Sequence, residues 1–317
     1  MEAKHFLMKK FLEYYKKAEI QMPKQFERRE FAFVPFEVLP DFFMHRHISF
    51  SSCEDFRSYT ISNVPAHVYY SSAYYENPGK DEMEEKVWLG ADLIFDIDAD
   101  HLPLKTNSVE RALEVAKREV KKLLQVLKHD FGTKDLEVYF SGGRGYHVHV
   151  HDEDFLNLES AERREIVDYL TINNPIIIHK RRILESNVSI RVKTYLKKIK
   201  KLEDRELLKA LKKPDEIIEK FRIYIDAPVT ADVKRLIRMP GTLHGKTGLK
   251  VVKVEDLDSF NPLRDAIVFG EDKIKLKTLK KVKITIGEEE LNLNAGEVVE
   301  VPEFAGIYLL CRGFASL

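Results

Sequence analysis

The spacing of apolar side chains predicts two amphipathic helices in the first half of the chain. Apolar positions recur three and four residues apart in residues 4–18 and again in residues 107–129, with charged residues between them. This period places the apolar side chains on one face of a helix. Asn107, followed three residues later by Glu110, is typical of the capping chemistry that opens a helix, so the second helix is predicted to begin there.

Alternating and continuous apolar runs predict strands at several further places. Runs of this kind occupy residues 29–36, 46–75, 91–97 and 136–140, the segment that begins at Val148, and residues 222–226 and 249–254. The run ADLIFDI, residues 91–97, is short and rich in apolar residues, which suits a buried strand. The C-terminal portion is predicted to form further strands, with turns at Gly287 and Gly296.

Residues 153–222 differ from the rest of the chain because they are helix-like and dense in charge. We interpret them as a helical insertion whose charged faces are solvated. The remainder, residues 1–152 and 223–317, mixes helices and strands, so it is predicted to form an α/β core. A chain of 317 residues is long enough to bury a sizeable core of this kind.

Composition excludes some classes of protein and leaves others open. Lys and Arg together number 52, as do Asp and Glu, so the net charge says nothing about partners. The two cysteines, Cys53 and Cys311, are far apart, which argues against a disulfide framework or a cysteine zinc site. The N-terminal residues are too charged for a signal peptide, and no apolar run is long enough to cross a membrane. The expected location is the cytoplasm.

The sequence LIFDIDADH, residues 93–101, ends an apolar strand with acidic residues. Asp96 and Asp98 are two positions apart, so on a strand they point to one face, while Ile97 points to the other. Two neighbouring carboxylates repel each other unless a cation lies between them or one of them is protonated. Such oxygen ligands suit Mg²⁺ or Mn²⁺, although a solvated strand end followed by a turn is an equally simple interpretation of this stretch alone.

The sequence YFSGGRGYHVHVHD, residues 139–152, contains a glycine-rich turn. Three glycines let the backbone approach a ligand closely, and successive backbone N–H groups can bind an anion. One interpretation is a triphosphate cradle made by Ser141, Arg144 and His147. A metal site built from alternating histidines is a second, and a hairpin turn with surface histidines is a third. The segment lacks the Lys-Ser/Thr pair of the common phosphate loop and the long helix of a dinucleotide fold.

A second region, residues 225–251, combines one acid with dense positive charge. Asp226 follows a short apolar run, and after it come Lys234, Arg235, Arg238, His244 and Lys246 around a Pro-Gly turn. Such a basic segment suits phosphate contacts, although a solvated helix face has a similar composition. If folding brings Asp226 to Asp96 and Asp98, the three carboxylates form the arrangement expected for two-metal phosphoryl transfer.

Three motifs follow one another in a fixed order: D-I-D at the end of a strand, S-G-G-R-G-Y-H, and D-x₁₃-P-G-T-L-H-G-K-T-G. This combination resembles the catalytic small subunit of archaeal and eukaryotic DNA primases, with the closest likeness to the archaeal branch. Residues 27–33 and 45–50, ERREFAF and HRHISF, resemble the basic N-terminal segment of the same family. The resemblance covers nearly the whole chain.

The resemblance implies a fold, an activity and a set of site residues. The fold is an irregular α/β core of two strand layers with a small helical subdomain inserted. The activity is the start of short primers from nucleoside triphosphates on single-stranded DNA. Asp96, Asp98 and Asp226 would bind the catalytic Mg²⁺ or Mn²⁺, and the nucleotide would contact Ser141, Arg144, His147, Arg46, Arg238, His244 and Lys246.

The resemblance also implies partners, and it has one departure. A large subunit would form a heterodimer with this chain, and any iron–sulfur cluster would belong to that subunit. Family members usually carry a zinc knuckle after the D-x-D strand, whereas no cysteine lies between Cys53 and Cys311 here. Structural zinc is therefore expected to be absent.

Three other functions fit parts of the sequence. A repair or plasmid polymerase of the primase superfamily would extend existing ends rather than start new ones. A metal-dependent hydrolase would use His147, His149 and His151, although the preceding S-G-G-R-G suits an anion better than a metal. A catalytically silent scaffold that binds single strands is the third, and the intact acids count against it.

Overall fold

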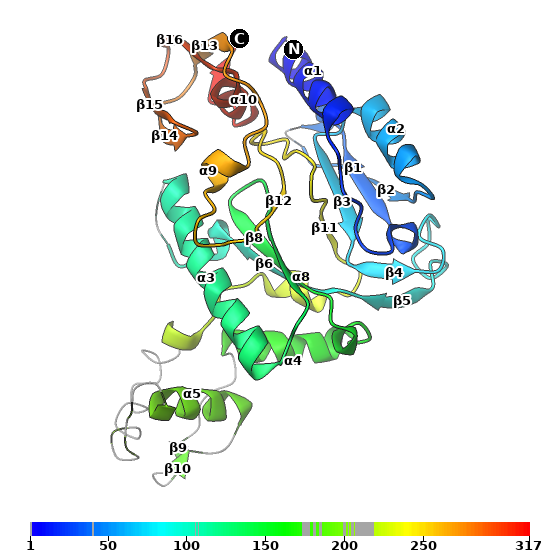
Figure 1. Ribbon diagram of the computed structural model, residues 1–317, viewed down its shortest axis with the longest axis vertical. Helices are drawn as coiled ribbons and strands as arrows, with labels where there is room; N and C mark the ends of the chain where they lie inside the picture. Colours follow the sequence, from blue (N-terminus) through cyan, green and yellow to red (C-terminus); the bar gives the residue numbers. More distant parts are fainter. Residues whose placement is uncertain are drawn as a thin grey trace.

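The computed structural model has a mixed α/β fold, as the sequence predicts (Figure 1). It describes residues 2–39, 41–104, 106, 108–172, 178–179, 182–183, 186–198, 201, 203, 206 and 219–317. Among these residues every pairing between strands is antiparallel. The described part of the chain is therefore unlike a parallel dinucleotide-binding sheet.

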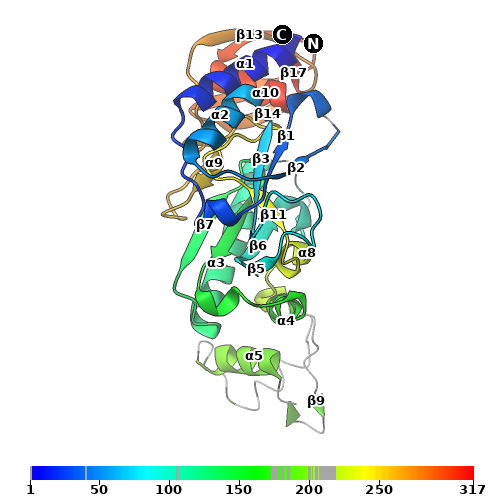
Figure 2. The ribbon, with the colours of Figure 1, turned by 90° about the vertical axis from the view of Figure 1, so that its right-hand side faces the viewer.

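Two four-stranded sheets form the centre of the molecule (Figures 1 and 2). The first has the strand order β11-β3-β1-β2, and the second has the order β12-β7-β8-β6. The first consists of β1 (Phe31–Val34), β2 (His45–Ile48), β3 (His67–Ser71) and β11 (Leu236–Arg238). The second consists of β6 (Leu93–Asp98), β7 (Leu136–Phe140), β8 (Gly145–Val150) and β12 (Val252–Lys253). Each sheet thus takes an edge strand, β11 or β12, from the last third of the chain.

Helices lie against these sheets on their outer sides (Figure 1). They are α1 (Glu2–Lys17) and α2 (Cys53–Asn63) beside the first sheet, and α3 (Val109–Asp130) beside the second. Phe56 of α2 packs against Phe31 and Phe33 of β1, with ring centroids 5.6 and 6.2 Å apart. These contacts bury the apolar faces of helix and sheet together, which is the main stabilisation available to either element.

Helix α3 shows how the predicted apolar spacing becomes packing. Its apolar stripe includes Leu123 and Leu127, which are fully buried against the second sheet. The Ser108 side chain accepts the backbone N–H of Arg111 at 3.1 Å and so caps the first turn. The predicted cap, Asn107, lies outside the described residues, and Ser108 is the N-cap in the structure.

The C-terminal part forms a smaller β unit. Its elements are β13 (Lys273–Thr278), β14 (Val282–Ile286), β15 (Glu289–Leu293), β16 (Val298–Pro302), α10 (Glu303–Cys311) and β17 (Ala315–Ser316). The predicted turns are confirmed, since Gly287 and Gly296 have positive φ angles of 59° and 87°. Helix α10 was not predicted, because residues 305–310 are apolar and buried on all sides, which hides the helical period.

The remaining elements connect these units. They are β4 (Ala73–Tyr75), β5 (Trp88–Ala91), β9 (Ile178–His179), β10 (Arg182–Ile183), α4 (Ser160–Thr171), α5 (Asn187–Lys198), α8 (Ala227–Ala231) and α9 (Pro262–Asp265). Short 3₁₀ turns lie at Phe26–Arg28, Phe36–Val38, Ala99–His101 and Glu153–Phe155.

Two strand predictions were wrong. Within the segment 46–75, residues Cys53–Asn63 form α2, because the Ser52 hydroxyl accepts the N–H of Asp55 at 3.1 Å and opens a helix. Residues 222–226 belong to no strand, because α8 begins directly after them at Ala227, with Pro228 in its first turn. Of residues 249–254, only Val252–Lys253 forms a strand.

Part of the predicted insertion, residues 153–222, lies outside the described residues. Within its described part, α4 packs on the core, where the buried Arg163 guanidinium donates to the carbonyls of Asp92 and Ala91 at 3.0 and 2.8 Å. The boundaries of the insertion remain a prediction. None of the described helices is both long and apolar enough to cross a membrane.

Candidate active site

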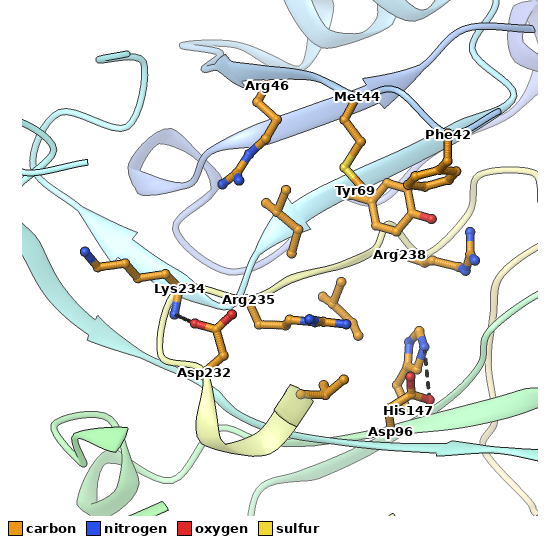
Figure 3. A pocket seen from close by; sticks show the side chains of 13 residues that line it. Phe42, Met44, Arg46, Tyr69, Asp96, His147, Asp232, Lys234, Arg235 and Arg238 are labelled. Carbon is orange, nitrogen blue, oxygen red and sulfur yellow. Dashed lines mark hydrogen bonds and ion pairs between the residues drawn. The ribbon is translucent and has the colours of Figure 1, made fainter. Parts of the chain in front are cut away.

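A polar pocket of about 370 Å³ opens between the two sheets (Figure 3). Its walls come from the loop before β2, from β2, β3, β6, β8 and β11, and from α8 with the turn that follows it. The lining residues are Phe42, Met44, Arg46, Tyr69, Asp96, His147, Val229, Asp232, Lys234, Arg235, Leu236, Ile237 and Arg238. We call this cavity the basic pocket, because four of these side chains are Lys or Arg and only two are carboxylates. Such a surplus of positive charge favours an anionic ligand.

Three carboxylates lie near one another beside the basic pocket, and Asp96 is the one that lines it. Asp96 and Asp98 lie on the same face of β6, as the strand period predicts, while Ile97 is fully buried on the other. The backbone N–H of Asp226 donates to the carbonyl of Asp96 at 2.8 Å, which fixes residue 226 beside β6. The structure thus brings Asp226 next to a pair of acids far away in the sequence.

The charges of these carboxylates act on one another. Burial, together with the charges of Asp98 and Asp226, raises the pKa of Asp96 to about 7. Arg238 and Arg235 oppose this effect because their positive charge favours the ionised carboxylate. A cation that binds beside Asp96 would therefore stabilise its ionised carboxylate.

The three carboxylates are not arranged around a common point in this structure. Among the described residues, no group of three His, Cys, Asp or Glu side chains is arranged to hold a metal ion. Asp98 instead accepts the backbone N–H of Asp100 at 3.0 Å, and Asp226 Oδ2 lies 3.9 Å from His101 Nδ1. Two of the three carboxylates therefore interact with local partners in this arrangement.

The two histidines of β8 and His151, which directly follows the strand, have different surroundings. His147 lines the pocket with Nε2 3.8 Å from Asp96 Oδ1, and burial holds its pKa well below the usual value, so it is neutral. His149 lies behind it, where burial lowers its pKa to about 3 and Tyr70 is its hydroxyl partner at 3.4 Å. His151 contacts Asp92 and Glu137. Only His147 reaches the pocket, so the geometry does not favour a histidine metal site of a hydrolase.

The glycine-rich turn of residues 141–145, the SGGRG turn, packs on a second turn, residues 244–248, which we call the HGKTG turn. Thr247 Oγ1 donates to the carbonyl of Gly142 at 2.6 Å. Gly142 has φ of +77°, and a Cβ atom there would lie 2.7 Å from His244 Cβ. Only glycine allows this approach, so the two motifs form one unit despite their separation in sequence.

The predicted site residues fall into two groups. Arg46, Asp96, His147 and Arg238 line the basic pocket. The others do not line it but lie on the segments that border it: Asp98, Asp226, Ser141, Arg144, His244 and Lys246. Arg144 forms an ion pair with Asp100. Burial lowers the pKa of His244, and the charges of Arg238 and of the exposed Lys246 lower it further.

Sequence reasoning gave no role to two buried residues that position pocket cations. His67 accepts from Arg238 Nη1 at 2.8 Å and from the backbone N–H of Gly245 at 3.3 Å, and burial keeps its pKa well below the usual value. Glu30, which is fully buried, accepts from Arg46 Nε at 2.9 Å. A single histidine and a single glutamate on strand-like segments carry no sequence signal of such a role.

Pocket residues outside the predicted set also include Lys234, Arg235 and Asp232. The basic segment had drawn attention to Lys234 and Arg235, and the structure places both in the wall. A helix face was the alternative for this segment, whereas Leu236–Arg238 form β11. Asp232 Oδ1 accepts the backbone N–H of Lys234 at 2.9 Å and so shapes the turn before that strand.

Comparisons with known proteins point to one family. Residues 95–256 match the family described as DNA primase small subunit. DNA primase small subunit PriS of Archaeoglobus fulgidus is 58% identical over 335 aligned positions, covering 100% of this chain and 99% of the relative. The corresponding protein of Methanococcoides burtonii is 35% identical, covering 100% of this chain and 99% of the relative. Both alignments are longer than the 317 residues of this chain, so the relatives have residues without a counterpart here.

Among solved structures, the polymerase domain of Mycobacterium tuberculosis ligase D in complex with DNA is similar with a TM-score of 0.42 and 13% identity. The likeness covers 80% of this chain and 83% of that chain, and it is too low to support a functional argument.

Proposed function

The chain belongs to the family of DNA primase small subunits, and from that premise we propose that it synthesises primers in the basic pocket. It is a nucleotidyltransferase of the primase type. Its substrates would be nucleoside triphosphates, and its template would be single-stranded DNA. The observation that carries this proposal is one pocket between two sheets that is lined by four basic side chains and by Asp96, with Asp98 and Asp226 close enough for their charges to act on Asp96.

The basic side chains suit the phosphates of the nucleotide. Arg46, Lys234, Arg235 and Arg238 all face the same cavity, and their charges are not cancelled by the two carboxylates there. Arginine binds phosphate oxygens through its planar fork, and a fixed positive charge stabilises negative charge that grows on the phosphates in the transition state. The SGGRG and HGKTG turns, including Ser141, Arg144, His244 and Lys246, would extend this surface.

The carboxylates suit a divalent cation. Asp96, Asp98 and Asp226 would hold Mg²⁺ or Mn²⁺, because their oxygen atoms are the ligands that these hard cations prefer. The pKa of Asp96, which burial and the neighbouring carboxylates raise to about 7, supports this assignment. Without a cation, a proton on Asp96 relieves the repulsion between the carboxylates, and a bound cation would relieve it in the same way. When bound, such ions help deprotonate the attacking hydroxyl and neutralise the pyrophosphate leaving group.

His147 would contribute as a neutral group between the carboxylates and the basic side chains. It lies 3.8 Å from Asp96 and is almost completely buried, so its ring can orient that carboxylate or donate to a phosphate oxygen without adding charge. Glu30 and His67 would keep Arg46 and Arg238 directed into the cavity.

The partners follow the family. We propose that a large primase subunit forms a heterodimer with this chain and that the enzyme acts in the cytoplasm with the replication machinery. The expected absence of structural zinc rests on the sequence, in which no cysteine occurs between Cys53 and Cys311, and it remains a prediction.

The experiment that tests this function measures products on unprimed and primed single-stranded DNA. The full chain is incubated with nucleoside triphosphates and Mg²⁺ or Mn²⁺, and oligonucleotides are resolved by length. Primer synthesis on the unprimed template is the expected result. Products on the primed template alone would favour a polymerase that extends existing ends, and no product on either would contradict the proposal.

A further inference from the structure

One corner of the basic pocket is lined by aromatic and apolar side chains rather than by charged ones (Figure 3). Phe42, Met44 and Tyr69 line this corner. The Phe42 ring meets Tyr69 edge to face with centroids 6.2 Å apart. Tyr69 also carries the guanidinium of Arg238, whose carbon lies 5.1 Å from the ring centroid. The apolar corner is therefore joined to the basic wall through Tyr69.

Phe42 is exposed although its ring is large and apolar. Its relative exposure is 49%, and that of the neighbouring Phe43 is 60%. Across the described ranges, these two are the aromatic members of the set of large hydrophobic residues that stay exposed. An aromatic ring left in water forgoes the stabilisation of burial, so its place at the wall of a charged cavity points to a ligand that covers it.

We propose that the Phe42 ring is the surface on which the base of the bound nucleotide stacks. This inference rests on the proposed function, since it requires the basic side chains to hold the phosphates of the same molecule. A nucleoside triphosphate has a highly charged end and a flat aromatic end. The pocket offers cations and an exposed aromatic ring within one cavity of about 370 Å³, a volume in the range of small-molecule sites.

The chemistry of this corner predicts contact without choice among bases. Phe42 and Met44 have no strong hydrogen-bonding groups, so they cannot read the edge of a base. Stacking uses the π face, which all four bases share, and is therefore tolerant of sequence. A template-dependent polymerase needs a contact of this kind, because base pairing with the template selects the base.

Phe43 provides a matched control. It is the next residue in the same loop and is more exposed than Phe42, but it does not line the pocket. Its ring lies against His45, with centroids 5.4 Å apart. Phe43→Ala thus removes the same ring from the same loop without changing the wall of the cavity.

The test compares ligands that share the triphosphate and differ in whether the nucleoside, and with it the base, is present. Binding of each of the four nucleoside triphosphates and of inorganic tripolyphosphate to the full chain is measured by calorimetry in Mg²⁺. Phe42→Ala should weaken binding of all four nucleotides about tenfold and leave tripolyphosphate binding unchanged. Phe42→Trp should retain nucleotide affinity, and Phe43→Ala should change neither ligand.

Three outcomes would overturn the assignment. In the first, Phe42→Ala binds nucleotides as tightly as Phe43→Ala does. In the second, it loses affinity for tripolyphosphate to the same extent, which would mean that the ring only supports the cations. In the third, affinity falls for one base alone. Failure of the proposed function would look different, because the wild-type chain would then bind neither ligand.

Discussion

Asp96 is the residue at which the opposing charges of the pocket meet. Burial and two neighbouring carboxylates raise its pKa, and two arginines lower it. The strand period was enough to predict that Asp96 and Asp98 share a face. It could not predict that Asp226 joins them, because that depends on a backbone hydrogen bond between segments distant in the sequence.

His67 is the residue whose role in the pocket can be tested most simply. His67→Ala removes the acceptor that holds Arg238 at 2.8 Å, so the guanidinium loses its fixed position. Because a hydrogen bond to a charged group contributes about 2 kcal/mol, we predict that KM for nucleotide rises roughly tenfold or more, with a smaller change in kcat. Steady-state kinetics of primer synthesis would measure this.

The control for that variant is His45→Ala. His45 is exposed on β2 and does not line the pocket. An equal KM in the two variants would contradict the positioning role of His67. Thermal unfolding of both proteins distinguishes a local effect from general loss of structure.

His151 directly follows β8, and its surroundings predict that the stability of the protein depends on pH. Burial lowers its pKa, but hydrogen bonds and charge from Asp92 and Glu137, each 3.1 Å away, outweigh this and raise the pKa to about 9. A raised pKa means that the stabilisation is complete below the unfolded value of about 6.5 and is lost as pH rises through 9.

We therefore predict that the free energy of unfolding falls by about 2 kcal/mol between roughly pH 6.5 and 9.5. Urea titrations across this range measure it, and His151→Gln should remove most of the slope. His129→Gln, an exposed position in the last turn of α3, should leave the slope as it is. A slope unchanged in His151→Gln would rule out this ion cluster as its source.

At the scale of elements, the steric contact between the SGGRG and HGKTG turns can be tested separately from the backbone strain at Gly142. Gly142 and Gly132 both have positive φ angles, +77° and +69°, so alanine at either position is strained. A Cβ atom at Gly142 would lie 2.7 Å from His244, whereas nothing lies within 4 Å at Gly132. The two substitutions therefore share the backbone cost and differ in the steric one.

We predict that Gly142→Ala destabilises the protein by about 2 kcal/mol more than Gly132→Ala does. Gly142→Ala should also raise KM for nucleotide, because the HGKTG turn has to move away from the pocket. Chemical unfolding and kinetics of both variants provide the comparison. Equal destabilisation by the two substitutions would mean that the turns do not depend on this close contact.

The same scale shows where sequence reasoning succeeds and where it fails. Helices α1 and α3 and strands β6 and β7 were predicted because their apolar residues follow a helix or strand pattern, whereas β8 begins at Gly145, three residues before the predicted start at Val148. Helix α2 was missed because aromatic residues around it suggest strands, while its start depends on one Ser52 cap. Residues 222–226 have the composition of a strand, but they form no strand, and the bond from the Asp226 N–H to the Asp96 carbonyl connects them to β6.

At the scale of the whole molecule, charge is balanced overall but not locally. Equal numbers of acids and bases hide the basic pocket, because folding gathers Arg46, Lys234, Arg235 and Arg238 from two distant segments. Composition alone could not have shown this. The sequence motifs did indicate it, since both basic segments belong to motifs, and the structure shows that these segments meet.

Both sheets are also completed by strands from the last third of the chain. β11 brings Arg238 to β3, and β12 closes the sheet that contains β6 and β8. The pocket therefore forms only when the segments before residue 153 and after residue 222 have folded together.

The most direct test of this account is the rate of primer synthesis on unprimed single-stranded DNA by Asp226→Asn. The substitution removes one charge with little change of shape, at the residue that the fold alone brings to Asp96. We predict a fall of about a hundredfold or more, while Asp154→Asn, at an exposed position in the 3₁₀ turn after β8, keeps the wild-type rate. An undiminished rate in Asp226→Asn would contradict the claim that these carboxylates form one catalytic site.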